Sequence, residues 1–414
     1  MAGKDLEAER KTTTATQERF TKEFAVLCTL GAFAIFSSTI SKSPTLSLFA
    51  KFLKAGPAEI GLIAAASTVV GIFTNVTAGA LSDLYGRKPL ILVATLIFAS
   101  APFLYLLVTD VWQLILVRVY HGFATATLAP VMSAAIADMF SSRRGEMMSL
   151  SSSSQYVGRL LAPIVGGSII SLLGFSLPAF HQIYLICGFS GSIALLLALS
   201  LFLLPTARSS TVQRRRVLEN LREVPKHGGF LSMSSALAAL YLSVGPVETF
   251  LPLYAQSLGL SGLEIGILLS VQTAVTLFAG PVFGRLSDRR GRRVFIMLGL
   301  GVVALSLVLL SFSGVFALLL LVMLLYGSGM TMALSAIPPL VSDLVPQQVY
   351  GASLGALETI KDVGQTLGPI VAGVAVGLSG YFGAFSLIGG IIAVNLGLLN
   401  LVLRRRLKQG RNAA

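Results

Sequence analysis

The sequence predicts an all-α membrane protein of two similar six-helix bundles, and three observations support this prediction. First, 54% of the 414 residues are hydrophobic and 12% are charged. A bilayer-spanning helix needs about 20 mostly apolar residues, and the chain contains twelve such segments. Second, the first half recurs in the second about 205 residues later. Third, the basic residues gather on alternate loops, as in a chain that crosses a membrane many times.

The expected helices follow one another with short connections. The first follows a polar segment, 1–23, which lacks the apolar core and cleavage site of a secretory signal. We therefore expect a disordered cytoplasmic tail followed by an uncleaved first helix. Glycine and proline punctuate the segments, as membrane helices tolerate. In order, the segments are 24–49, 60–82, 89–109, 111–139, 147–172, 180–204, 230–256, 263–284, 294–313, 315–341, 351–379 and 382–403.

The one long polar linker lies between the sixth and seventh segments. It spans 205–229 and contains three consecutive arginines, Arg214 to Arg216. We place the domain boundary there. The expected organisation is a cytoplasmic tail 1–23, an N-terminal six-helix bundle 24–204, a cytoplasmic linker 205–229, a C-terminal six-helix bundle 230–404 and a cytoplasmic tail 405–414.

The net charge of +13 would suit a nucleic-acid-binding protein, but the placement of the charge opposes that interpretation. The tails and alternate loops carry 25 of the 31 lysines and arginines, whereas the opposite loops hold only Lys51 and Lys54. This is the asymmetry of a multi-pass protein with both termini in the cytoplasm. We expect a cell (inner) membrane protein whose basic loops contact anionic lipid headgroups.

A ten-residue motif occurs twice, as GALSDLYGRK at 79–88 and GRLSDRRGRR at 284–293. Its central glycine allows a tight turn between two helices. The acid before the turn and the basic pair after it can form ion pairs across a bundle interface and favour one conformation. The alternative is that the basic pair only orients the helix. We interpret as a conformational latch the residues Gly79, Asp83, Gly86, Arg87 and Lys88 and their counterparts Gly284, Asp288, Gly291, Arg292 and Arg293.

At these residues the chain resembles the major facilitator superfamily, whose signature is this motif after the second helix. The resemblance extends over nearly the whole chain. It implies two six-helix bundles, a cavity that opens alternately to either side, and transport by rocking about that cavity. It also implies that the latch lies at the inner face, with its acid near the start of the eleventh helix, here near Gly351.

Two further motifs resemble patterns of this superfamily, the first found in many of its members and the second in its drug:proton antiporters. The fourth helix contains Arg118 and Gly122 in an R-x-x-x-G pattern, which the resemblance links to proton coupling. The alternative is an arginine that bonds nearby carbonyls or reaches outward. The fifth helix resembles G-x-x-x-G-P-x-x-G-G, with alanine at 162 where the family usually has glycine, and helix packing alone would also explain it. Its motif residues are Gly158, Pro163, Gly166 and Gly167.

Four further charged residues lie within predicted membrane helices. Arg159 lies about 18 Å from the inner start of its helix at 1.5 Å per residue, and an intramembrane cation needs an acid, water or an anionic substrate. Glu358, Lys361 and Asp362 lie on neighbouring turns of one helix face. A carboxylate in a dry site can carry a proton. We expect these four and Arg118 to bind substrate or couple protons; static ion pairs are the alternative.

Lys42 and Glu248 occupy nearly equivalent positions in the two halves, close to the outer ends of their helices. We expect them to form an outer gate between the bundles. The alternative for Lys42 is a lysine that extends to the membrane surface.

No enzyme motif, metal-ligand spacing or nucleotide-binding loop appears in the sequence. We expect no enzymatic activity, no cofactor and no metal. The expected function is secondary active transport by a monomer, namely proton-coupled efflux of small amphipathic compounds. The buried cations slightly outnumber the buried acids, so a carrier of organic anions, importing or exporting, is one alternative. A non-transporting receptor of the same fold is the other.

Overall fold

The computed structural model describes residues 2–140, 143–203, 229–346 and 350–412, and within these ranges the chain is helical apart from short connections. The all-α class is confirmed. The N-terminal half contains α1 (Ala2–Lys42), α2 (Thr45–Phe52), α3 (Pro57–Tyr85), α4 (Arg87–Tyr105), α5 (Val111–Met139), α6 (Arg144–Leu173) and α7 (Leu177–Leu203). The C-terminal half contains α9 (Phe230–Ser257), α10 (Gly262–Arg290), α11 (Arg292–Ser311), α12 (Phe316–Leu344) and α13 (Tyr350–Asn412).

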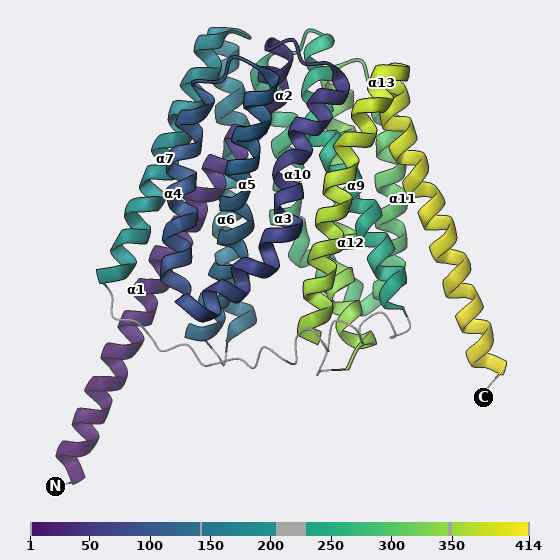
Figure 1. Cartoon of the computed structure of the whole chain (residues 1–414). Helices are drawn as coiled ribbons and strands as arrows, with labels where there is room; N and C mark the ends of the chain where they lie inside the picture. The colour runs from purple at the N-terminus through teal and green to yellow at the C-terminus, as the bar shows by residue number, and fades with distance from the viewer. Residues whose placement is uncertain (1, 141–142, 204–228, 347–349, 413–414) are drawn as a thin grey trace.

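Eleven stretches of the described chain are long and apolar enough to cross a membrane. The last of them, Gly355–Val402, is 48 residues long and contains two crossings, because the backbone turns at Gly380 (φ 70°, ψ −174°). Figure 1 shows α13 passing along the bundle, turning at the far end and returning towards the C-terminus. The described residues therefore include the twelve crossings that the sequence predicts.

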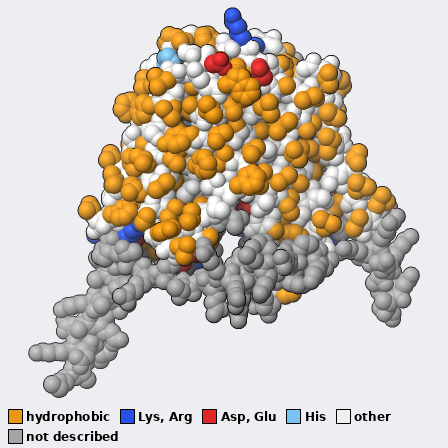
Figure 2. Space-filling model, viewed as in Figure 1, with side chains coloured by type: hydrophobic (Ala, Val, Ile, Leu, Met, Phe, Trp, Pro, Cys, Tyr) orange, Lys and Arg blue, Asp and Glu red, His pale blue; other side chains and the backbone are white. Residues whose placement is uncertain are grey.

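The sides of the molecule are apolar and its charged residues lie near the two ends. Figure 2 shows a broad belt of hydrophobic side chains over the helices, with Lys, Arg, Asp and Glu at the rims. Large apolar residues such as Phe73 (72% exposed) and Leu378 (84% exposed) would be unfavourable in water, and acyl chains cover such a belt. Both termini lie at one end of the bundle (Figure 1). We call that end the inner end and the opposite end the outer end.

The structure corrects the sequence expectation in the first segment. The tail 1–23 was expected to be disordered, but α1 is helical from Ala2, because alanine, glutamate, lysine and arginine favour helices. The predicted helix 24–49 is divided: α1 ends at Lys42 and α2 begins at Thr45. Pro44 lies between them, and proline lacks an N–H and restricts the residue before it. The linker 205–229 lies outside the described residues except for Gly229.

The two halves meet along two related seams at the outer end. In one seam, a Cβ atom placed on Gly61 of α3 would lie 2.3 Å from the carbonyl oxygen of Pro369 in α13. In the other, a Cβ atom on Gly266 of α10 would lie 2.2 Å from the carbonyl oxygen of Pro163 in α6. Gly61 and Gly266 are counterparts in the repeat, and so are Pro163 and Pro369. Glycine lets the backbones come this close, as in other membrane helix pairs.

The inner ends of the two halves differ from the outer ends. A Cβ atom on Gly79, Gly284 or Gly355 would meet no other atom within 4 Å. These glycines lie towards the inner ends of α3, α10 and α13. Close backbone contact between the halves is therefore found at the outer end, and these inner positions are open.

Candidate functional site

The charged residues of α13 lie against α3 of the other bundle. Lys361 forms an ion pair with Glu358, and its Nζ lies 3.9 Å from Oδ1 of Asp362. The other carboxylate oxygen of Asp362 accepts a hydrogen bond from Nδ2 of Asn75 at 2.6 Å. One turn further along α13, Thr366 donates a hydrogen bond to Thr68 at 2.9 Å. The α3–α13 seam thus continues inward from its glycines through polar side chains.

Near the middle of the bundles, each of two cations lies over a tyrosine ring. The guanidinium carbon of Arg159 lies 5.8 Å from the centroid of the Tyr156 ring on α6. Nζ of Lys361 lies 5.8 Å from the centroid of the Tyr241 ring on α9. Tyr241 is also close enough to Arg159 and Tyr156 to interact with them electrostatically, although they belong to the other half. We name as the interbundle cluster Tyr156, Arg159, Tyr241, Glu358, Lys361 and Asp362.

Arg118 is hydrogen-bonded to α3 and forms no ion pair with a described carboxylate. Arg118 is 3% exposed, and its Nη2 donates to Oγ of Ser67 on α3 at 2.5 Å. Among the described residues, its Nε has no hydrogen-bond partner and no carboxylate forms an ion pair with it. On the same helix, the ring of His121 packs against Tyr105, whose ring is in turn stacked on Tyr184 with centroids 4.5 Å apart. Arg118 is thus linked to α13 through α3: it bonds Ser67, and the next residue, Thr68, accepts a hydrogen bond from Thr366 of α13.

The first latch motif pairs within its own bundle. Arg87 forms ion pairs with Asp83 at 2.5 Å and with Asp138 of α5 at 3.1 Å. Gly86, at φ 93°, makes the turn between α3 and α4. Lys88 is buried, donates to the carbonyl oxygen of Leu201 at 2.6 Å and lies 3.4 Å from a carboxylate oxygen of Glu23.

The second latch motif repeats this arrangement. Arg292 forms ion pairs with Asp288 at 2.9 Å and with Asp343 of α12 at 2.5 Å. Gly291, at φ 102°, makes the turn between α10 and α11, and Arg293 is exposed. In both motifs the arginine therefore ties the inner end of one helix to a neighbour in the same half, and the structure does not place either arginine against the opposite bundle.

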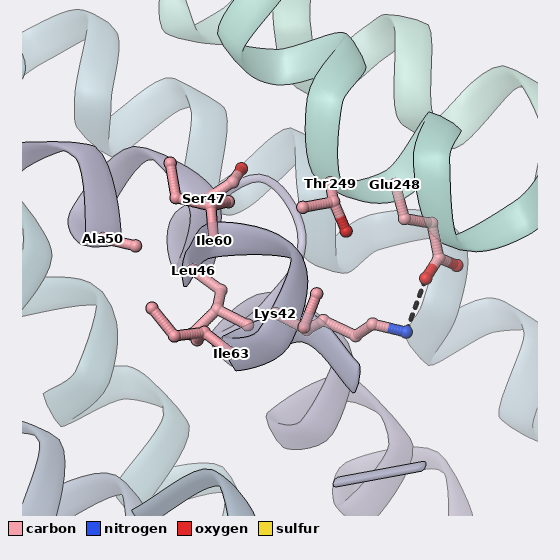
Figure 3. Close-up of a pocket in the computed structure, with 9 residues that line it drawn as sticks. Lys42, Leu46, Ser47, Ala50, Ile60, Ile63, Glu248 and Thr249 are labelled. Atoms are coloured by element: carbon pink, nitrogen blue, oxygen red, sulfur yellow. Dashed lines mark ion pairs between the residues drawn. The ribbon is translucent and has the colours of Figure 1, made fainter. Parts of the chain in front are cut away.

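Lys42 and Glu248 meet across the two halves near the outer end. Nζ of Lys42 lies 2.5 Å from a carboxylate oxygen of Glu248, and both side chains are about a quarter exposed. Figure 3 shows this ion pair beside a small pocket. Lys51 of α2 adds a second contact between the halves, a 3.0 Å hydrogen bond to Gln256 of α9. The pocket is lined by Lys42, Leu46, Ser47, Ala50, Ile60, Ile63, Ala64, Glu248 and Thr249.

The glycines and proline of the motif on α6, the fifth predicted membrane helix, pack against other helices. A Cβ atom on Gly158 would lie 2.5 Å from the carbonyl oxygen of Ala32, and one on Gly167 would lie 2.2 Å from that of Gly262. A Cβ atom on Gly166 would lie 3.3 Å from the side chain of Ile40, and Pro163 lies in the α6–α10 seam. The motif therefore brings α6 close to α1 in its own half and to α10 in the other.

Several residues of the site were missed by sequence reasoning. Asn75, Ser67 and Thr68 are polar residues in an apolar helix, and their partners lie far away in the sequence. The contact of Tyr156 with Arg159 could have been predicted, because Tyr156 precedes Arg159 by three residues and shares its helix face. Tyr241 had none, because only the packing of α9 brings it to the other half.

Comparison with protein families identifies the class. The sequence model described as Major Facilitator Superfamily matches residues 27–263 and 233–414, which together cover nearly the whole chain. The chain therefore belongs to the Major Facilitator Superfamily. It is a multi-pass, non-enzymatic membrane transporter of small molecules.

The more similar curated relatives are distant. An uncharacterised MFS-type transporter of Methanocaldococcus jannaschii is 23% identical over 362 residues, covering 85% of this chain and 92% of the relative. The multidrug resistance protein MdtG of Enterobacter lignolyticus is 25% identical over 332 residues, covering 79% and 78%. The quinolone resistance protein NorA of Staphylococcus aureus is 27% identical over 134 residues, covering 32% and 34%.

Solved structures share the fold. A bacterial homologue of the human lysosomal transporter Spinster, in an inward-facing and unoccupied conformation, matches with a TM-score of 0.79 at 16% identity, covering 94% of this chain and 98% of that one. A mutant of the nucleoside transporter NupG matches with a TM-score of 0.78 at 16% identity, covering 92% and 99%. These likenesses support the two-bundle architecture.

Proposed function

We propose that this transporter exports small amphipathic molecules in exchange for protons. The observation that carries the proposal is the position of Asp362, a buried acid within the first crossing of α13 that is bonded to Asn75 of the other half. An acid at this place can change its proton and its interbundle contact in one step. Relatives named for multidrug and quinolone resistance favour export of amphipathic compounds.

The chemistry follows from the strength of the Asn75–Asp362 hydrogen bond. An ionised carboxylate accepts a stronger hydrogen bond than a protonated one. Ionised Asp362 therefore holds α3 and α13 together in the conformation that is closed at the outer end. Substrate that enters from the inner side breaks this bond when the outer seam opens, and Asp362 then takes up a proton from the outer side as the substrate leaves. After the outer end has closed again, proton release towards the inner side restores the bond.

Arg118 contributes to this cycle as a positioning residue. Its guanidinium holds Ser67, and the adjacent Thr68 accepts a hydrogen bond from Thr366, one helical turn from Asp362. Loss of Arg118 would leave Ser67 without its donor and loosen α3 at the level of the acid. The Lys42–Glu248 ion pair serves as the outer gate, and the two latch motifs stabilise the opposite conformation when the inner ends approach.

The test is substrate-dependent proton release from inverted membrane vesicles, followed with a pH-sensitive dye. Cationic and anionic aromatic amphiphiles are added in turn to the wild-type protein. We expect a response that Asp362→Asn abolishes and Arg118→Ala reduces, at unchanged protein level. Glu146→Gln is the matched control, because it removes an exposed acid at the start of α6.

Proton release that persists in Asp362→Asn would contradict the role of this acid. Export of an amphiphile without any proton movement would show an uncoupled carrier. Binding without flux would favour the receptor alternative.

A further inference from the structure

The charges of the interbundle cluster do not cancel evenly. Lys361 is neutralised by Glu358 and lies close to Asp362. Among the residues that the structure describes, by contrast, no carboxylate lies within ion-pair distance of Arg159, whose side chain is exposed. Arg159 nevertheless lies midway along α6, within electrostatic range of Tyr241 of the opposite half. Its cationic group is therefore the part of the cluster that is available to an added anion.

The geometry around Arg159 suits an acid that has a flat apolar body. Its guanidinium lies over the Tyr156 ring, and a stacked guanidinium keeps its N–H groups free at the edge, where they can bind a carboxylate in a bidentate manner. A lysine at this place would lack the planar group with its paired N–H donors. The contact with the Tyr156 ring therefore does not use the N–H donors of Arg159.

The aromatic residues come from both halves. Tyr156 belongs to α6 and Tyr241 to α9, both are half-buried, and they are close enough to interact electrostatically. Aromatic side chains bind flat apolar groups well through offset or edge-to-face contacts. An aromatic ligand that reaches Arg159 would therefore meet a tyrosine from each bundle, and such a ligand would contact both moving parts of the transporter.

We infer that the interbundle cluster binds aromatic compounds that carry a carboxylate or similar acid group, with Arg159 as the acid-binding residue and Tyr156 and Tyr241 as the aromatic contacts. This inference rests on the proposed export function and specifies the substrate class for it. Cationic amphiphiles without an acid group would meet the unneutralised Arg159 and bind weakly.

The experiment measures equilibrium binding to the purified full-length protein in detergent by isothermal titration calorimetry. The probes are 2-naphthoate, 2-naphthamide and 2-naphthylmethylammonium, which share the ring system and differ in charge. We expect naphthoate to bind about tenfold more tightly than either of the others, because hydrogen bonds to charged groups are the stronger ones. Equal affinity for the three probes, a preference for the cation, or binding of none of them would overturn the inference.

Variants assign the preference to particular residues. Arg159→Gln is expected to weaken naphthoate binding about tenfold and to leave naphthamide binding unchanged, whereas Arg159→Lys retains part of the preference. Tyr156→Leu and Tyr241→Leu are expected to weaken all three probes. Arg143→Gln is the matched control, because it removes an exposed arginine just before the same helix. A preference for naphthoate that survives in folded Arg159→Gln protein would contradict the assignment.

The outcomes separate this inference from the proposed export function. Binding is measured without a proton gradient, so a transporter that exchanges protons for other amphiphiles would fail this test and still pass the proton-release test. Conversely, selective naphthoate binding with no proton movement would support the substrate class and contradict proton coupling. If Arg159→Gln does not fold, the wild-type protein is compared with Arg159→Lys. Identical probe selectivity in these two proteins would contradict bidentate binding by the planar guanidinium of Arg159.

Discussion

Single residues hold the two halves together at the outer end. Lys42 and Glu248 form an ion pair between α1 and α9, at positions that are nearly equivalent in the repeat. Partly exposed pairs of this kind contribute about 0.2–1 kcal/mol, and like charges at the same place repel by a similar amount. The pair is thus strong enough to bias a conformational equilibrium and weak enough to break in each cycle.

Reversing one charge of this pair should slow transport. We expect Lys42→Glu to lower the transport rate about fivefold, because two carboxylates then face each other where the outer end closes, and about 1 kcal/mol corresponds to this factor. The double exchange, Lys42→Glu with Glu248→Lys, should recover most of the rate. Lys54→Glu, an exposed change at the same end, is the control. If the exchange recovered nothing, the pair would not act as a gate.

At the scale of helices, the seams depend on glycine. Gly61 and Gly266 each face a backbone carbonyl at a distance that no Cβ atom could tolerate. The facing helices, α13 and α6, cannot give way locally, because carbonyl oxygens belong to the helix backbone. The seams therefore close only with glycine at these positions, and the same feature in both halves gives the outer end its twofold character.

Gly266→Val should force the α6–α10 seam apart, at a cost of about 1–3 kcal/mol to the outer-closed conformation. The measurement is the distance between spin labels at Leu172 and Leu258, both exposed at the outer end, in protein whose two free cysteines, Cys28 and Cys187, are replaced by serine. We expect a longer distance than in the parent. Gly377→Val in α13 is the matched control, since its Cβ atom meets open space. An unchanged distance in Gly266→Val would show that the seam is not limiting.

For the whole molecule, the arrangement of contacts defines an asymmetric state. Backbone seams and the Lys42–Glu248 pair close the outer end, while Arg87 and Arg292 pair within their own halves at the inner end. Glu358 of the interbundle cluster is 64% exposed in this state. Water therefore reaches the cluster although the outer end is closed, which is the accessibility that alternating access requires of one of its two states.

Cysteine labelling checks this asymmetry. We expect a cysteine introduced by Glu358→Cys to react with a membrane-impermeant maleimide in inverted vesicles and to be protected in intact cells. Ser47→Cys, buried beside the outer pocket, should remain unlabelled from both sides. The background again lacks Cys28 and Cys187. Labelling of Glu358→Cys in intact cells alone would reverse the assigned orientation.

Much of the fold could be predicted from the sequence because it depends on local properties. Hydropathy located the crossing segments, since burial of apolar residues in a bilayer is decided segment by segment. The repeat predicted two related bundles, and the glycines of the latch motifs marked turns that need positive φ. Family membership followed from the same motifs. Where local propensity and hydropathy disagreed, as in residues 2–23, the boundary of α1 was wrong.

The sequence by itself thus determined the class, the crossings, the repeat and the residue types that carry charge. Only the tertiary structure decided which of these residues meet. Asn75 and Asp362 are 287 residues apart, and their hydrogen bond exists because α3 packs on α13. The same packing separates Arg118 from the carboxylates and gives it Ser67, while α9 brings Tyr241 to Arg159. Contacts between helices depend on which faces abut, and no local pattern along the chain encodes that choice.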